Sequence, residues 1–271
     1  MNNIMFLARL LVLFSLVCIS CAHSSFEQKQ LKHALDFATS NRLELEILLQ
    51  HYTYDSLKLE AAKFLIRNMP HCYSYQQGGE MDSVKRVRTY YSPFGQIDQT
   101  YARRWGHYTY RNLPKIYDAH IITAEYLIDN IDRAFDNWQK RPWNRSLSFE
   151  DFCEYLLPYR IGDEPLEEWR ELYEKKYGYL LDSIYKGSDV VEAANLVSRH
   201  LQEPVFIYCE DFELPHIGPR YLFSHRYGSC VDAADIVTYA FRAVGIPCME
   251  DTDARGGHVW NVVRDTTGRD V

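Results

Sequence analysis

The segment from Gly228 to Pro247 most constrains how this chain can fold, because it encodes both ends of one helix. After a turn of small residues, apolar side chains recur at the spacing of a single helical face: Ala233, Val237, Ala240, Phe241 and Val244. Gly245 occupies the position at which many helices end in a left-handed residue, and a proline two residues later cannot continue the helix. The sequence therefore predicts a helix that begins at or beside Cys230 and ends near Val244.

A strand is predicted after this helix. A short extended piece (CME) and a polar loop (DTDARGG) lead to the stretch HVWNVVR, which alternates in the manner of a strand, and DTTG is typical of a hairpin turn. His258 stands at the start of that strand, 28 residues after Cys230. We therefore expect His258 to return to the beginning of the helix, close to Cys230.

Cys230 and His258 are the candidate catalytic residues. The dipole and free N–H groups of a helix N-terminus lower the pKa of a cysteine thiol, and a thiolate paired with an imidazole can attack an amide carbonyl. The same N–H groups can bind the oxyanion that forms. Taken singly, a cysteine is more often a small buried hydrophobic residue or half of a disulfide, so the catalytic interpretation depends on the order of the motifs.

That order resembles the transglutaminase-like superfamily: G-S-C opens a helix, G-I-P ends it, and G-H-V-W-N opens a strand. The resemblance covers about 46 of the 271 residues. It implies a papain-like core in which a cysteine-bearing helix meets an antiparallel sheet, with Cys230 as nucleophile and His258 as base. Trp260 matches the aromatic residue that follows the histidine, and Asn261 receives no role.

Two upstream phrases carry a second resemblance. LELEILLQHYTYDSLKLEAAKFLIRNMP and FCEYLLPYRIGDEPLEEW look similar to the N-terminal region of large lipoproteins that carry this domain in gut-type Bacteroidetes. This similarity assigns no function to the upstream residues. Packing and solvated helix faces account for them, and the alternative is a substrate groove lined by Trp143, Tyr159, Arg160 and Trp169.

The residue that would orient His258 is not evident in the sequence. In the resembling family this third residue is usually an Asp on the next strand. A tight DTTG turn would pair Val263 with Asp270, so the partner of His258 would fall near position 275, and Asp270 would lie roughly 16 Å from it at ~3.3 Å per residue. Asp265, at the turn, is farther still. We therefore expect an incomplete sheet in a chain shortened at its C-terminus; two acids in the preceding loop are the nearest substitutes, Asp251 and Asp253.

Two classes of function remain open. One is a thiol enzyme that acts on amide bonds of protein or peptide substrates, by hydrolysis (protease or deamidase) or by amine transfer, which the sequence does not separate. The other is a catalytically inactive module that binds protein or glycan at the cell envelope. A metal site made of His216, His225 and His258 has no ligand pair at helical or zinc-knuckle spacing, so we predict no metal and no cofactor. With a formal net charge of -7, the chain has no electrostatic support for a nucleic-acid partner.

The first 20 residues are predicted to be a bacterial signal peptide. Arg9 is their only charge, and the apolar run from Leu10 to Ser20 is too short to span a bilayer. A small residue directly before Cys21 resembles a lipobox, in which Cys21 is lipidated and anchors the protein to the membrane of the cell envelope, on its periplasmic or outer side. Residues 21–26 would form a tether. The alternative is an ordinary secretory signal with an incidental cysteine, and the usual leucine of a lipobox is replaced here by Cys18.

The rest of the chain divides into a helical region, residues 27–185, and the transglutaminase-like core, residues 186–271, which together give an α+β fold. Apolar periodicity predicts helical structure from residue 27 to residue 69, with Leu57 on an apolar face of its last part, and a second helix from residue 115 to about 139. A further solvated helix would open at Pro165. Residues 78–111 are polar and aromatic and read as loops. Removing Cys18 and lipidating Cys21 would leave five cysteines, an odd number, so at least one thiol would stay free or pair between chains.

The lipid anchor is directly testable. We expect metabolic labelling with a palmitate analogue to mark the wild-type protein and not Cys21→Ala, because the thiol of Cys21 is the predicted acceptor of the lipid. Labelling followed by in-gel fluorescence measures this. Equal labelling of the two proteins would contradict the lipobox.

Overall fold

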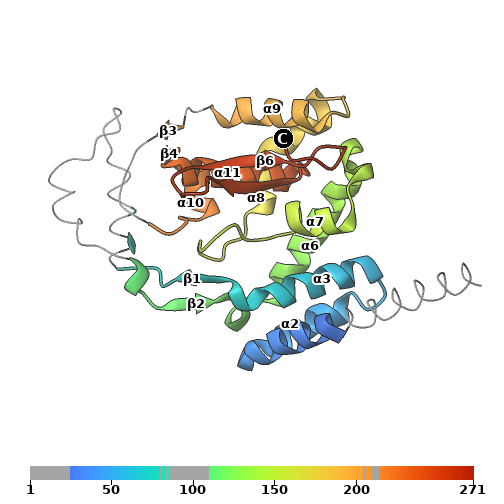
Figure 1. Ribbon diagram of the computed structural model, residues 1–271, viewed down its shortest axis with the longest axis vertical. Coiled ribbons are helices and arrows are strands. Elements are labelled where there is room, and N and C mark those ends of the chain that lie inside the picture. Colours follow the sequence, from blue (N-terminus) through green and yellow to red (C-terminus); the bar gives the residue numbers. More distant parts are fainter. Residues whose placement is uncertain (1–24, 80, 83–84, 86–109, 204–205, 209–213) are drawn as a thin grey trace, which may run out of the picture.

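The computed structural model describes residues 25–79, 81–82, 85, 110–203, 206–208 and 214–271 (Figure 1). The predicted signal peptide, Cys21 and most of residues 78–111 lie outside this part of the chain. Helices predominate, and three two-stranded sheets accompany them, so the α+β fold class is confirmed. None of the described helices is both long enough and apolar enough to cross a membrane.

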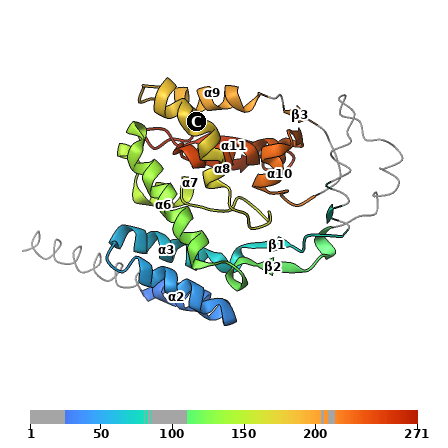
Figure 2. The same ribbon diagram turned by 180° about the vertical axis from the view of Figure 1, so that it is seen from behind.

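The principal helices are α2 (Arg42–His51), α3 (Ser56–Asn68), α6 (Ala124–Lys140), α7 (Phe149–Tyr155), α8 (Arg170–Tyr179), α9 (Val190–Leu201), α10 (Pro219–Ser224) and α11 (Cys230–Val244). The strands are β1 (Tyr73–Tyr75), β2 (Lys115–Tyr117), β3 (Ile207–Tyr208), β4 (Tyr227–Gly228), β5 (Cys248–Thr252) and β6 (Val259–Val263). Residues 25–37 are also helical, so the last two residues of the predicted tether, residues 25 and 26, belong to a helix. In both ribbon views α2 and α3 lie on one side of the molecule and α9 on the other, with α11 and the β5–β6 hairpin between them (Figures 1 and 2).

The N-terminal helices share one hydrophobic core. Helices α2, α3, α6 and α7 and residues 25–37 contribute to it, and the largest wholly buried side chains are Leu45, Leu48, Ile66, Met69, Leu127, Ile131 and Phe152. The start of α3 is fixed by Asp55, whose side chain accepts a hydrogen bond from the Lys58 backbone N–H at 3.1 Å. Leu57 is exposed rather than buried, so its predicted place on the apolar face of this helix is wrong.

Helix α6 begins nine residues later than the periodicity indicates, at Ala124 rather than at residue 115. Residues 115–117 instead form β2, which pairs antiparallel with β1. Isoleucine and tyrosine favour extended backbone there, and a 3-10 turn over Asp118–His120 follows. Thr123 then starts α6, because its side chain accepts a hydrogen bond from the Tyr126 backbone N–H at 3.2 Å. A local cap therefore overrides the apolar repeat.

Helix α8 differs from its prediction in both position and environment. It begins at Arg170 and not at Pro165, because the Glu164 carboxylate accepts hydrogen bonds from the backbone N–H groups of Ile161 and Gly162 and holds the preceding segment in a turn. Tyr173 is wholly buried, and α8 packs against α11. The predicted solvated helix is thus wrong, since one face of α8 belongs to the C-terminal core.

Helix α11 is the centre of the C-terminal half. It runs over the residues that the sequence predicts, Cys230–Val244, and Gly245 ends it in the left-handed region with φ +82°. Its buried side chains pack on α8, α9, α10 and the β5–β6 hairpin. The hairpin is antiparallel, with Cys248 opposite Val263 and Thr252 opposite Val259, which confirms the predicted strand after His258.

The turn after β6 has a register one residue away from the predicted one. Val263 exchanges backbone hydrogen bonds with Val271, and the Asp265 N–H donates to the Arg269 carbonyl, so Val263 does not pair with Asp270. Gly268 adopts φ +79° and supplies the extra residue of the loop. The shift leaves Asp270 on the opposite side of the strand from the side first expected.

The left-handed end of α11 gives a test of its packing. Gly245→Ala should destabilise the protein by more than the roughly 1–2 kcal/mol that a left-handed alanine costs, because its Cβ would lie 2.8 Å from the Asn137 carbonyl oxygen. Urea unfolding measures the loss. The matched control is Gly256→Ala, where φ is +68° and no atom lies within 4 Å of the new Cβ. Equal losses in the two variants would contradict the packing argument.

Candidate functional site

Cys230 is the first residue of α11. Ser229 and Asp232 form a capping box, in which the Asp232 carboxylate accepts hydrogen bonds from the Ser229 backbone N–H at 2.8 Å and from its hydroxyl at 3.1 Å. The thiol is free and partly exposed. The prediction that Cys230 lies in the first helical turn is confirmed.

His258 directly precedes β6, at the end of the β5–β6 hairpin nearest the start of α11. Asn261 fixes this arrangement, because its amide donates to the Ala234 carbonyl at 3.0 Å and to the Thr238 hydroxyl at 2.8 Å. The three residues back to His258 span about 10 Å of strand, and the four residues from Ala234 to Cys230 rise about 6 Å along the helix. The hairpin loop therefore reaches the level of the helix start.

The thiol and the imidazole are not hydrogen-bonded to each other. Within the described part of the chain, neither Cys230 Sγ nor the ring of His258 makes a hydrogen bond. The exposed His258 ring instead lies beside Trp260, with the ring centroids 6.0 Å apart. Apo active sites often hold their catalytic groups apart, and they tighten when substrate binds.

Each acid considered as the orienting residue is occupied elsewhere. Asp270 accepts hydrogen bonds from the Tyr155 hydroxyl at 2.9 Å and from Arg264 at 3.1 Å. Asp265 accepts from the Thr267 and Arg269 backbone N–H groups of its own turn. The two loop acids, Asp251 and Asp253, accept from Thr252 and Gly257 respectively. Among the described residues, none of these four carboxylates hydrogen-bonds to the His258 ring; the backbone N–H of Asp253 donates to the His258 carbonyl at 3.1 Å.

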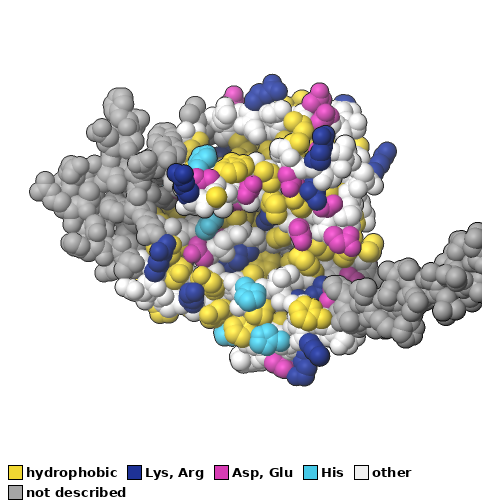
Figure 3. All heavy atoms as spheres, viewed as in Figure 1, with side chains coloured by type: hydrophobic (Ala, Val, Ile, Leu, Met, Phe, Trp, Pro, Cys, Tyr) yellow, Lys and Arg dark blue, Asp and Glu magenta, His cyan; other side chains and the backbone are white. Residues whose placement is uncertain are grey.

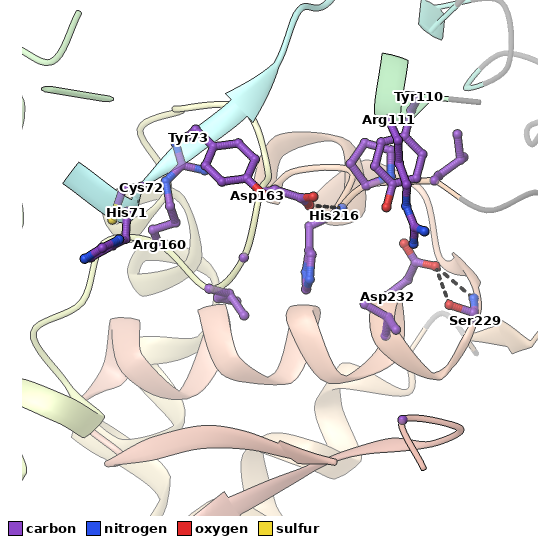
Figure 4. Close-up of a pocket in the computed structure, with 16 residues that line it drawn as sticks. His71, Cys72, Tyr73, Tyr110, Arg111, Arg160, Asp163, His216, Ser229 and Asp232 are labelled. Carbon is purple, nitrogen blue, oxygen red and sulfur yellow. Dashed lines mark hydrogen bonds between the residues drawn. The ribbon is translucent and has the colours of Figure 1, made fainter. Parts of the chain in front are cut away.

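A cleft of about 920 Å³ opens beside the start of α11 (Figure 4). Its walls are residues 71–73, 110–111, 160–163 and 214–216 together with the first turn of α11, and His216 lies above that turn. Ser229 and Val231 line the cleft on either side of Cys230 in the sequence. Positive and negative side chains are interspersed over the face that Figure 3 shows, so this face carries no patch of a single sign.

The wall at residues 160–163 is held by a buried ion pair. Arg160 forms a salt bridge to Asp118, which is wholly buried, and Tyr159 donates its hydroxyl proton to the same carboxylate at 3.0 Å. Burial raises the pKa of Asp118 and the guanidinium of Arg160 opposes that change. The pair ties the cleft wall to β2, in the N-terminal half of the chain.

His216, which lines the cleft, forms a polar cluster with Asp235 of α11 and Glu250 of β5. His216 Nδ1 lies 2.8 and 3.0 Å from the two carboxylate oxygens of Asp235, which has no exposed surface. The Thr238 hydroxyl donates to Glu250 at 3.1 Å and in turn accepts from Asn261. A continuous chain of polar groups therefore runs from the cleft to the strand that follows His258.

The charges of this cluster depend on burial. Burial alone would lower the pKa of His216, but the charge of Asp235 outweighs it and raises this pKa to about 10. Burial, and next the charge of Asp235, raise the pKa of the Glu250 carboxyl to about 9. At neutral pH the cluster thus contains an imidazolium and a protonated Glu250. Burial also raises the pKa of Asp235, and the charge of His216 opposes that change.

Sequence reasoning missed this cluster, although one signal was available. Asp235 interrupts the apolar run of the predicted helix, and a buried carboxylate requires a partner. The partner, His216, was considered only as a metal ligand with His225 and His258. His225 bonds to the Tyr221 carbonyl through Nδ1 at 3.0 Å, and the described residues hold no group of three or more potential ligands that could bind a metal.

The alternative substrate groove of Trp143, Tyr159, Arg160 and Trp169 is not a surface feature. All four residues are buried, and the Trp143 and Trp169 N–H groups donate to the carbonyls of Gly245 and Tyr159. Arg160 alone among them lines the cleft. The packing interpretation of the three aromatic residues is therefore correct.

No protein-family model matches the chain, and no curated protein or solved structure matches it either.

Replacement of Glu250 tests the charge state of the cluster. A carboxyl whose pKa is raised in the folded state stabilises the fold at low pH, and that stability is lost as the pH rises from its ordinary value of 4.5 toward about 9. Glu250→Gln keeps the shape without the titration, so its free energy of unfolding should exceed that of wild type at pH 8.5, with a slope difference of at most about 1.4 kcal/mol per pH unit.

Urea unfolding between pH 5.5 and 8.5 measures the two slopes. His216 contributes a slope of the same sign above pH 6.5 and is present in both proteins. The control is Glu171→Gln, at an exposed carboxylate whose pKa is lowered by Lys175 and which does not titrate in this range. Parallel slopes for wild type and Glu250→Gln would show that Glu250 is already ionised.

Proposed function

We propose that the chain is a thiol enzyme with a transglutaminase-like, papain-like core, which transfers or hydrolyses acyl groups at amide bonds of protein or peptide substrates. The observation that carries the proposal is the packing of Asn261 on α11, because it brings the hairpin loop of His258 to the helix that Cys230 begins. The cleft beside that helix start is large enough for several side chains of a peptide.

In the proposed reaction Cys230 thiolate attacks the carbonyl carbon of the amide. His258, as the imidazolium, gives its proton to the leaving amine nitrogen, and the C–N bond breaks to leave a thioester. Water or a second amine then attacks the thioester while His258 accepts its proton, and the thiolate is released. Hydrolysis and amine transfer differ only in this second nucleophile.

A non-catalytic binding module is the second candidate, and one observation favours it. Asp265, Asp270, Asp251 and Asp253 are all engaged away from His258, and loss of an orienting acid costs about 10⁴ in rate in a serine-based triad. Such a module would use the same cleft to bind protein or glycan.

We also propose that the protein acts at the bacterial cell envelope, attached through a lipid on Cys21. This rests on the lipobox resemblance. Both candidate functions require only that the cleft faces a protein or peptide partner outside the membrane.

Alkylation by iodoacetamide separates the two functions. A thiolate–imidazolium pair makes Cys230 reactive at neutral pH, so His258→Ala should slow modification of Cys230 at pH 7 by about tenfold or more. Mass spectrometry of tryptic peptides reports the rate for each cysteine in the same sample.

The other described thiols are internal controls. Burial raises the pKa of Cys72 to about 11 and the pKa values of Cys153 and Cys248 to about 12, so these thiols should react slowly and equally in both proteins. If Cys230 reacts at the same rate with and without His258, the enzyme proposal fails and the binding module takes its place.

A further inference from the structure

The wall of the cleft contains a histidine, His216, of which one ring nitrogen is hydrogen-bonded and the other is not. His216 Nδ1 is bound by Asp235, while Nε2 has no hydrogen-bond partner among the described residues. The side chain of His216 is 24% exposed, whereas that of Asp235 is 0% exposed, so only the histidine is accessible from the cleft. In Figure 4 the side chain of His216 lies between Asp163 and α11, in the middle of the cleft.

The surrounding backbone is built around this ring. The His216 backbone N–H donates to Asp163 at 2.9 Å, and a side chain at Gly162 would overlap the imidazole. Glu164 holds the turn that brings Gly162 to the ring. Both the position of the ring and the absence of a side chain beside it are therefore set by residues 162–164.

Among the described residues, the acids near His216 all have other partners, and none of them hydrogen-bonds to Nε2. The charged groups that face His216 are Asp235 of α11, Glu250 of β5 and Glu164 of the 160–164 segment. Asp235 binds Nδ1, and Glu250 accepts a hydrogen bond from Thr238. Glu164 accepts hydrogen bonds from two backbone N–H groups and lies beside Arg160. Asp163 accepts from the His216 backbone, and Asp232 caps α11.

An imidazolium N–H that is confined by protein and lacks a charged acceptor favours a ligand that brings one. A carboxylate is the acceptor that gains most, because hydrogen bonds between two charged groups are roughly twice as strong as neutral ones.

We propose that the cleft binds a carboxylate group, from an acidic side chain or a peptide C-terminus, through the Nε2–H of His216. Asp235 is the positioning residue, because its two carboxylate oxygens hold Nδ1 and fix the direction of the ring. This proposal names a ligand class for the cleft and does not depend on the chemistry of Cys230. It can therefore be correct or wrong independently of the proposed function.

The test uses acetylated alanine pentapeptides with one changed central residue. One has a central glutamate and an amidated end, the second a central glutamine and a free C-terminal carboxylate, and the third a central glutamine and an amidated end. Calorimetry on the full chain should give at least one carboxylate peptide an affinity about tenfold or more above that of the neutral peptide. Which of the two binds tells a side-chain carboxylate from a C-terminal one.

His216→Gln should abolish this preference, and the matched control His200→Gln should retain it. His200 is a half-buried histidine on α9 whose Nδ1 bonds to the Leu196 carbonyl at 2.9 Å. If His216→Gln does not fold, the double variant His216→Gln, Asp235→Asn removes both charges together. In wild type, NMR of ¹⁵N-labelled histidine should show the His216 Nε2–H signal shift on addition of the carboxylate peptide alone. Equal affinities for all three peptides, or an unchanged preference in His216→Gln, would overturn the proposal.

Discussion

Three hydrogen bonds to the C-terminal end of α11 join the two halves of this protein. Arg141 donates to the Val244 carbonyl at 2.8 Å, and Trp143 and Asn144 both donate to the Gly245 carbonyl at 2.9 Å. A helix leaves its last four carbonyls without internal partners, and leaving one buried and unpaired costs about 1–3 kcal/mol. Because the donors directly follow α6, this end of α11 also fixes the N-terminal core against the C-terminal one, and the cleft forms between them.

Two buried guanidinium groups extend the same junction. Arg170 donates to Asn130 and to the Leu156 and Leu157 carbonyls at the end of α7, and Arg242 donates to the Tyr155 and Cys248 carbonyls. Burial lowers the pKa of Arg170 to about 9, and it also lowers the pKa of Arg242. Carbonyl oxygens rather than carboxylates surround these cations, so helices α7, α8 and α11 are held together by groups whose positions the backbone has already fixed. This rigidity suits a cleft whose chemistry depends on the directions of a few side chains.

The polar cluster beneath the cleft has a different physical character. The cluster of His216, Asp235 and Glu250 carries less charge than the same groups would carry in water, because burial leaves Glu250 protonated and also raises the pKa of Asp235. Thr238 and Asn261 continue the cluster to β6, so the ring in the cleft and the loop that carries His258 rest on one hydrogen-bonded network. A change in charge at either end would therefore affect the packing of the hairpin on α11.

The sequence by itself determined the elements whose signals are local. The limits of α11 follow from its capping box, apolar face and left-handed Gly245, and the strand after His258 follows from its alternation. The order of Cys230 and His258 along the chain was likewise readable, as was the α+β class. Tertiary structure decided what distant residues impose: α8 lost its first turn to the Glu164 cap and became buried, β2 replaced the start of α6, and the turn at Gly268 shifted by one residue. The His216–Asp235 pair belongs to the same group, because no periodicity in the sequence predicts a salt bridge between residues 19 positions apart. It forms only when the tertiary structure buries Asp235 beside His216.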